Sequence, residues 1–315
     1  MPFRVQVRPG MSSVSVSEAH STTMKPLVWL EIRRFARHPV FLAGLTACTV
    51  VLVVAEQDAI AHPTNDRIGA AAVALFIGVF SVLAAYFLTR SMKSAEEILE
   101  ATPTTRPRRT AALCATCGVS ALCAAAFGVF GVVALQIWPM PAWLWGTFSE
   151  VDLVVVMAQQ TVVAAVGGTF LGVAAGRWWR FRGAGLVLVV GLLFWVELSS
   201  GATAVVAADG TWPKLLRLFS PFAFFQTAQV DPTEAVDTFP GSPAWYLGWL
   251  LALCALAAVA AMLHRADGVV RARLMRLGPV LLASAAAFLI LAATHGPQHV
   301  VRSFPDGTTT VITSR

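Results

Sequence analysis

The sequence predicts an all-α integral membrane protein, a bundle of about seven transmembrane helices. Hydrophobic residues make up 57% of the 315-residue chain, and the mean hydropathy is +0.70. Charged residues make up only 13%, against roughly 25% in a soluble domain. The apolar residues also gather into seven long runs. We therefore expect one membrane domain over residues 24–294 rather than two soluble domains.

Residues 1–23 precede this domain and are polar, with no long apolar run and no small-residue cleavage site. We expect a disordered tail there and no cleaved signal peptide. The first apolar run must then direct insertion into the membrane itself.

A basic amphipathic helix is predicted immediately before the first apolar run. One helical face carries the apolar residues Val28, Trp29, Ile32, Phe35 and Ala36. The other face carries Glu31, Arg33, Arg34, Arg37 and His38. Such helices lie in the membrane interface, and Pro39 marks the turn into the bilayer. The alternative is an ordinary extension of the first span into the cytoplasm.

The seven apolar runs approach or exceed the roughly 20 residues that cross a bilayer. They lie near 39–55, 68–89, 110–138, 151–176, 183–206, 244–263 and 277–294. The last run is short and carries Pro279 near its start. A half-inserted helix that returns the C-terminal tail to the inner side is therefore the alternative there.

The distribution of Lys and Arg predicts the orientation of the bundle. With the N-terminus in the cytoplasm, 18 of the 23 Lys and Arg lie in the inner segments, which are 1–38, 90–109, 177–182 and 264–276. Inner loops of membrane proteins carry such an excess. We therefore expect a multi-pass protein of the plasma membrane, with its N-terminus in the cytoplasm and the tail 295–315 outside.

The connection between the second and third runs predicts a short cytoplasmic helix. Ser94 and Glu97 form a capping box at its start, and Pro103 ends it. Its apolar stripe consists of Ala95, Ile98, Leu99 and Thr102. Because a two-turn helix is not stable alone in water, this stripe must dock, either on a partner protein or on the chain's own bundle.

The longest outer connection, 207–243, contains an apolar stretch at 212–226. We expect short helices in the outer leaflet, broken at Pro221; the alternative is an interfacial loop of no special role. In the C-terminal tail, the segments 300–304 and 308–312 flank turn-forming residues and predict a hairpin. A lone hairpin is marginally stable, so it should be mobile unless it docks on this outer connection.

Four polar residues inside the apolar runs are candidates for a translocation path. They are Glu197 and Ser199 in the fifth run, and Gln159 and Gln160 in the fourth. A charge at the bilayer centre costs roughly 2.5–3.5 kcal/mol on insertion scales, so we expect Glu197 to face the bundle interior. The alternative role for Glu197 is a protonated carboxyl that is hydrogen-bonded within the bundle.

Small residues in the runs are interpreted as packing residues. Gly168, Gly172 and Gly176 form a ridge suited to close helix contact. Cys114 and Cys117 form a CxxC motif, but no second pair or His cluster accompanies them, so we expect no metal site.

The motifs of several protein classes are missing from the sequence. There is no GxxxxGK[ST], HExxH or GxSxG sequence, so we expect no ATP site and no catalytic site in this chain. A membrane-embedded enzyme would need more than the single acid Glu197. A membrane anchor or signalling partner remains the second alternative, and no nucleic-acid partner is expected.

Three stretches of the sequence resemble the permease subunits of ABC-2 type (type V) ABC transporters, especially small actinobacterial ones. They are EIRRFARHPVF before the first span, EEILEATPTTRPRRTAAL entering the third, and LFSPFAFFQ between the fifth and sixth. The resemblance covers residues 24 to about 263. The family usually has six spans, and the seventh run and outer tail depart from that pattern.

The resemblance implies a function and its partners. A separate ATP-binding subunit, which holds ATP and magnesium, would dock on the cytoplasmic face. Residues 94–102 would act as the coupling helix. Two permease copies, or one copy with a related chain, would form an export path through the bilayer.

Overall fold

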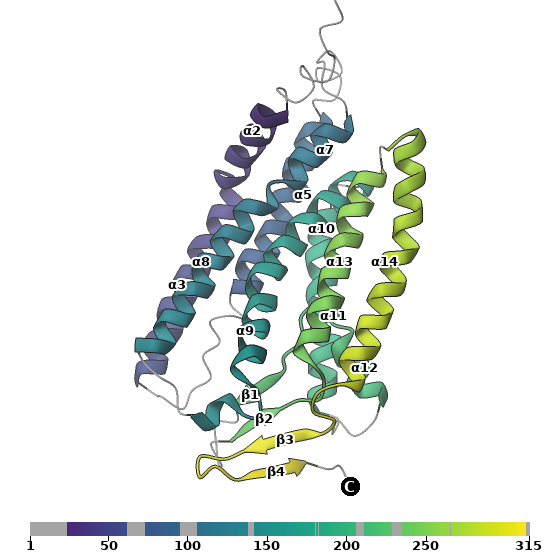
Figure 1. Cartoon of the computed structure of the whole chain (residues 1–315). Coiled ribbons are helices and arrows are strands. Elements are labelled where there is room, and N and C mark those ends of the chain that lie inside the picture. The colour runs from purple at the N-terminus through teal and green to yellow at the C-terminus, as the bar shows by residue number, and fades with distance from the viewer. Residues whose placement is uncertain are drawn as a thin grey trace, which may run out of the picture.

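The computed structural model describes residues 24–61, 73–94, 106–137, 142–179, 181, 183–205, 211–228, 235–264 and 266–312. Its helices run side by side in one bundle, and a small sheet lies at one end (Figure 1). The predicted tail 1–23 and residues 95–102 of the predicted cytoplasmic helix lie outside the described residues.

Helices occupy all seven apolar runs. They are α3 (Pro39–Ala61), π-helix η1 with α5 (Ala74–Gly78, Val79–Ser94), α7 with α8 (Arg106–Cys114, Cys117–Ile137), α9 with π-helix η3 and α10 (Glu150–Ala158, Gln159–Val163, Ala164–Trp178), α11 (Ala184–Val205), α13 (Pro243–Leu263) and α14 (Gly268–Thr294).

Four stretches of the described chain are long and apolar enough to cross a membrane, namely Pro107–Val133, Glu150–Trp178, Pro243–Leu263 and Gly268–Thr294. A fifth is added if α2 (Met24–Ala36) and the start of α3 form one bent span. Phe76–Met92 and Ala184–Ser199 are shorter apolar helices. These helices are compatible with a multi-pass membrane protein.

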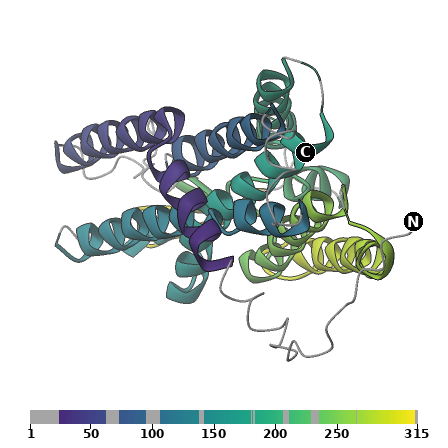
Figure 2. The same cartoon turned by 90° about the horizontal axis from the view of Figure 1, so that it is seen from above.

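The predicted helix before the first span is present as α2. It is bent by 53° from the Pro39–Val54 part of α3. Seen from above, α2 runs across the end of the bundle rather than along its axis (Figure 2). The bend follows His38, whose carbonyl accepts the first hydrogen bond of α3 from Leu42.

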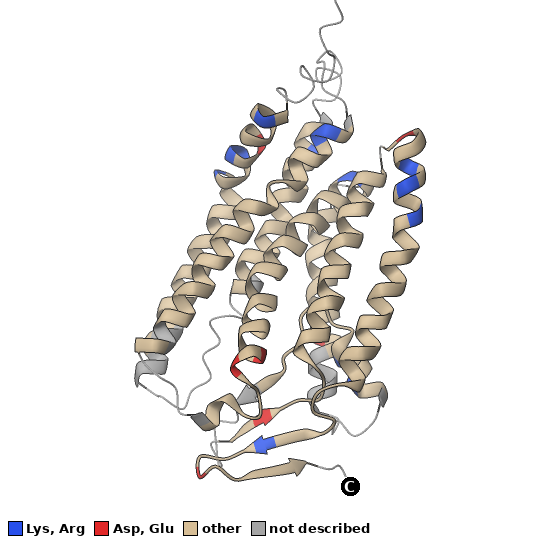
Figure 3. Ribbon diagram, viewed as in Figure 1, with Lys and Arg blue, Asp and Glu red and all other residues tan. Residues whose placement is uncertain are grey.

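Helix α14 is longer than predicted, because the stretch expected as a cytoplasmic loop is largely helical. It begins at Gly268 and carries Arg271, Arg273 and Arg276 in its first turns. Arg has a high helix propensity, and its long side chain can reach the headgroups from an apolar helix. Lys and Arg gather at this end of the bundle, where α2 and α7 also lie (Figure 3).

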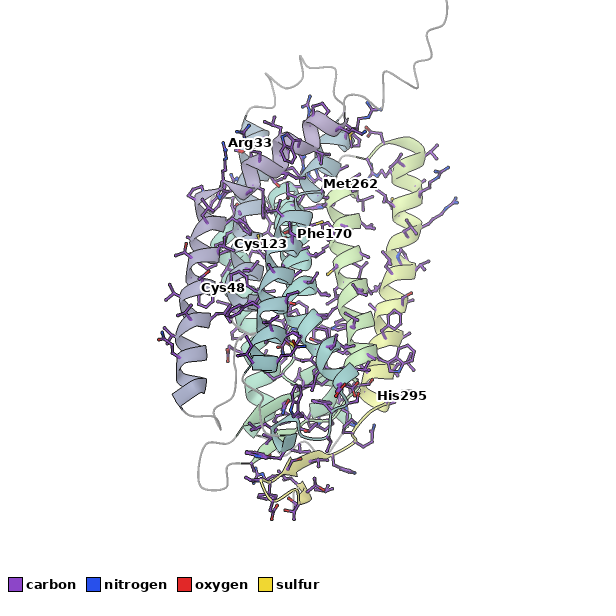
Figure 4. All side chains as sticks on the ribbon, turned by 60° about the vertical axis from the view of Figure 1, so that its left-hand side comes forward. Arg33, Cys48, Cys123, Phe170, Met262 and His295 are labelled. Atoms are coloured by element: carbon purple, nitrogen blue, oxygen red, sulfur yellow. The ribbon has the colours of Figure 1, made fainter. Side chains whose placement is uncertain are left out.

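The glycine ridge of α10 makes the close helix contact that the sequence predicts, and its partners are η1 and α5. A Cβ on Gly168 would meet the carbonyl oxygen of Gly78, and one on Gly172 would meet that of Val82. The two backbones therefore touch. The cysteines are free thiols among the core helices, and Figure 4 shows Cys48 and Cys123 midway along the bundle.

A four-stranded antiparallel sheet lies at the opposite end of the helical bundle. It consists of β1 (Gln226–Ala228), β2 (Val236–Thr238), β3 (Val300–Ser303) and β4 (Thr309–Ile312), in that order. Strands β3 and β4 confirm the predicted hairpin. It docks on the outer connection, because β3 pairs with β2.

In the part of the connection 207–243 that the structure describes before α13, residues 211–228 and 235–242, the one helix is α12 (Thr211–Leu218). The chain leaves the helical conformation before Pro221, and Gln226 already belongs to β1. The expected break at Pro221 is thus correct, whereas the expected helix after it is wrong. Backbone pairing with β2 satisfies the polar groups of this segment instead.

Candidate functional site

The basic end of the bundle is organised around α2. Glu31 and Phe35 are its buried residues. The Nη1 atom of Arg34 lies 3.0 and 3.3 Å from the two carboxylate oxygens of Glu31, and Nη2 donates to Ser91 Oγ on α5 at 3.3 Å. The Phe35 ring packs on Phe41 of α3 at 4.7 Å between centroids. Helix α2 is therefore joined to the bundle by a hydrogen bond to α5 and by packing on α3.

The polar and apolar faces of α2 differ from those predicted. Glu31, expected on the polar face, is buried, and Trp29, expected on the apolar face, is 66% exposed. The buried face is the one that meets α5 and α7. Arg34 forms an ion pair with the Glu31 carboxylate on that face. An indole ring suits the headgroup region, so exposure of Trp29 fits a helix in the interface. Ile32 is half-buried, and Arg33 and Arg37 are exposed.

Helix α2 contacts both helices that flank the predicted coupling segment. Helix α5 ends at Ser94 and α7 begins at Arg106, so residues 95–105 connect two helices against which α2 packs. Arg109 and Thr110 on α7 are buried close to this junction in the sequence.

A second set of contacts joins the basic ends of the remaining helices. Arg90 on α5 donates to the Phe181 carbonyl at 2.7 Å and to the Tyr86 hydroxyl at 2.9 Å. The Trp178 indole on α10 donates to the Ala260 carbonyl of α13 at 2.8 Å. This end of the bundle is held by hydrogen bonds between helices.

The four predicted path residues do not form one polar group. The Gln159 amide is buried and donates to the Pro243 carbonyl at the start of α13. Ser199 is buried, and its hydroxyl donates to the Trp195 carbonyl one turn earlier. Glu197 is exposed on α11, so the expectation that it faces the interior of its own bundle is wrong for the single chain. Gln160 is half-buried.

Gln159 begins a π-helical turn that the sequence did not predict. This turn, η3, contacts the other π-helix, η1, and Gly78 of η1 lies against Ala164 next to η3. π-Helical turns inside α-helices are often found at functional sites. The neighbouring Gln159 and Gln160 were a polar signal in an apolar run, but nothing in the sequence indicated the change of helix type.

A buried hydroxyl pair also joins α8 to α10. Ser120 Oγ lies 2.8 Å from Thr169 Oγ1, and Thr169 also donates to the Ala165 carbonyl at 3.0 Å. Both residues are fully buried. Together with the glycine ridge, this pair gives α10 tight contacts with two neighbouring helices.

The end of the bundle that carries the sheet holds two arginines in different environments. Arg302 on β3 makes two hydrogen bonds, of 2.7 and 2.8 Å, to the carboxylate of Asp237 on β2. Arg217 on α12 is buried; it donates to the Phe224 carbonyl, and its guanidinium carbon lies 3.4 Å from the Phe239 ring centroid. Burial lowers the pKa of Arg217 to about 10. The first contact joins the connection 207–243 to the C-terminal tail, and the second holds two parts of that connection together.

Among the residues that the structure describes, no group of three or more His, Cys, Asp or Glu side chains is placed to hold a metal ion. No family model, curated protein or solved structure matches the chain.

Proposed function

We propose that this protein is the transmembrane subunit of an ATP-driven ABC exporter in the plasma membrane. The basic end with α2 lies in the cytoplasm, seven helices cross the bilayer, and the sheet lies outside. A separate ATP-binding subunit supplies hydrolysis of ATP with magnesium. Two copies of the chain, or one with a related permease, enclose the path.

The position of α2 is the observation that carries this proposal. A transmembrane subunit without an ATP site must receive movement from its partner through a surface element. The segment 95–105 is such an element, because it joins two helices against which α2 packs. The Glu31–Arg34–Ser91 contacts link α2 to the end of α5, next to Ser94.

The bundle offers a route for this movement toward the outer side. Helix α5 leads into η1, which contacts η3, and η3 is hydrogen-bonded to the start of α13 through Gln159. Displacement of α5 would therefore act on both π-helical turns. A path lined by Glu197 would need a second chain to close it, because this residue is exposed in the single chain.

The decisive experiment is the double substitution Ile98→Asp and Leu99→Asp in the coupling segment. The protein should insert normally but lose co-purification with its ATP-binding partner, because two charges replace the docking stripe. The matched control is Thr104→Asp with Thr105→Asp, which adds the same charge to the same connection outside the stripe.

Three outcomes separate the possible functions. Loss of the partner and of export in the stripe variant, with both retained in the control, supports the proposal. Retention of both in the stripe variant rejects the coupling role of residues 94–102. An ATPase that binds but shows no ATP-dependent export in vesicles would favour an anchor or signalling role.

A further inference from the structure

Helix α12 has its cations on the covered side and apolar residues on the exposed side. Trp212, Leu216 and Phe219 are exposed, whereas Arg217 is only 5% exposed and Lys214 is half-buried. An amphipathic helix on a protein surface ordinarily has the opposite arrangement. The helix lies at the sheet end of the bundle (Figure 1). Its two cations are therefore directed toward the protein rather than toward open solvent.

The guanidinium of Arg217 is only partly satisfied by the chain. Its Nε and Nη2 atoms donate to one shared acceptor, the Phe224 carbonyl, at 3.1 and 2.7 Å, and its face covers the Phe239 ring. The Nη1 atom is buried and has no hydrogen-bond partner. Because a guanidinium has five N–H donors and buried donors are normally paired, this Nη1 atom needs an oxygen from elsewhere.

No carboxylate of the described chain compensates either cation of α12. Lys214 Nζ donates to a neutral acceptor, Gln298 Oε1, at 2.7 Å, and Arg217 forms no ion pair with a described residue. In contrast, Arg302 at the same end of the bundle is paired with the Asp237 carboxylate. A buried cation without a counter-ion is costly, so the covered side of α12 favours an anion that the chain itself does not supply.

The spacing of the two cations fits a phosphate group. Lys214 and Arg217 are three residues apart on one helix, which places their Cβ atoms about 5–6 Å apart on the same side. A phosphate monoester carries about −1.5 to −2 charges at pH 7 and three acceptor oxygens, enough for both side chains.

We propose that Lys214 and Arg217 bind a phosphate group between them. One oxygen accepts from Arg217 Nη1, and another accepts from Lys214 Nζ in place of Gln298. Lys214 is the more exposed of the two cations, so the phosphate approaches from its side. This site goes beyond the proposed function and does not rest on it.

Binding of labelled inorganic phosphate to the purified full chain in uncharged detergent tests the site. Equilibrium dialysis should show saturable binding. Lys214→Gln should weaken this binding at least about tenfold, because a charge-assisted hydrogen bond is lost. Arg217→Gln should weaken it further. Lys214→Gln decides the test if Arg217→Gln fails to fold, since Lys214 is bonded only to an exposed glutamine.

The double substitution Arg273→Gln with Arg276→Gln is the matched control. These two cations are also three residues apart on one helix, α14, but both are exposed. Their removal should change the phosphate affinity by less than about twofold, because exposed charges are screened by solvent and salt. Absence of saturable binding overturns the inference, as does undiminished affinity in Lys214→Gln or an equal loss in the control.

Competition with lipid identifies the source of the phosphate. Displacement of labelled phosphate by micelles that contain phosphatidic acid, but not by those with phosphatidylcholine, assigns the site to a lipid headgroup. Unchanged binding with both lipids assigns it to a soluble phosphate. All of these measurements use the chain without an ATP-binding partner. Failure of phosphate binding therefore leaves the export proposal standing, and loss of the partner in co-purification leaves the phosphate site standing.

Discussion

Gly172→Ala tests the closest helix contact of the bundle. An added Cβ would press on the carbonyl oxygen of Val82 and lie 2.9 Å from the Ala85 Cβ. Both atoms belong to α5 and cannot rotate away, so α10 and α5 must separate. Overpacking of this kind costs about 1–3 kcal/mol, while Ala gains about 1 kcal/mol of helix propensity over Gly.

Gly191→Ala in the interior of α11 is the matched control, because outside its own helix no atom of the described chain lies within 4 Å of its added Cβ. Both variants share the propensity gain, so the difference between them isolates the overpacking. We expect the free energy of unfolding of the two variants to differ by about 2 kcal/mol, which is close to a thirtyfold change in the unfolding equilibrium.

Unfolding in mixed detergent, followed by the fluorescence of the ten tryptophans, measures this difference. Equal midpoints for the two variants would refute the direct contact between α10 and α5. A lower unfolding midpoint in the Gly191 variant alone would show that the added methyl meets an atom there.

Three further predictions concern the two ends of the bundle. Arg302→Ala removes both hydrogen bonds from Arg302 to the buried Asp237 carboxylate, which costs about 1–3 kcal/mol, and should speed protease cleavage of the tail; normal resistance would contradict the role of the pair. Glu31→Ala removes the partner of Arg34 and should increase cleavage within α2, whereas Glu31→Gln should have a smaller effect. Thr309→Cys, on exposed β4, should react with a membrane-impermeant thiol reagent in intact cells; reaction only after lysis would reject the seven-span orientation.

The helices could be predicted because their signals are local. A long apolar run must satisfy its backbone internally in lipid, so each run identifies a helix before any contact is known. The bend before α3 follows from Pro39, and the β3–β4 hairpin from the turn at Asp306 and Gly307. Gly307 has φ +82°, a conformation that suits glycine and few other residues.

The sheet could not be predicted in full because its pairing is not local. Asp237 lies opposite Arg302, 65 residues later in the chain, and a three-residue strand such as β2 has too short a pattern to identify. The burial of Glu31 has a similar origin. The amphipathic pattern separates polar from apolar residues, but contact with α5 and α7 decides which side of α2 is covered.

The candidate path residues show the same limit. An acid in an apolar run indicates that it needs a polar partner, and this holds for Glu197. The sequence does not indicate whether that partner lies in the same chain or in another. In the structure the carboxyl is exposed on α11, so its polar partner is a matter of assembly with another molecule and not of folding.

The pairing of the C-terminal tail bears on the last helix. Ser242 N, directly before α13, donates to the Ala292 carbonyl of α14 at 2.9 Å, and Gly241 N donates to the Pro297 carbonyl. The start of α13 and the end of α14 are thus joined, and both lead into the same sheet through β2 and β3. A half-inserted α14 that returned its tail to the other side would break these bonds. The tail therefore shares the side of the outer connection, and whatever establishes the orientation of α13 establishes that of the C-terminal sheet as well.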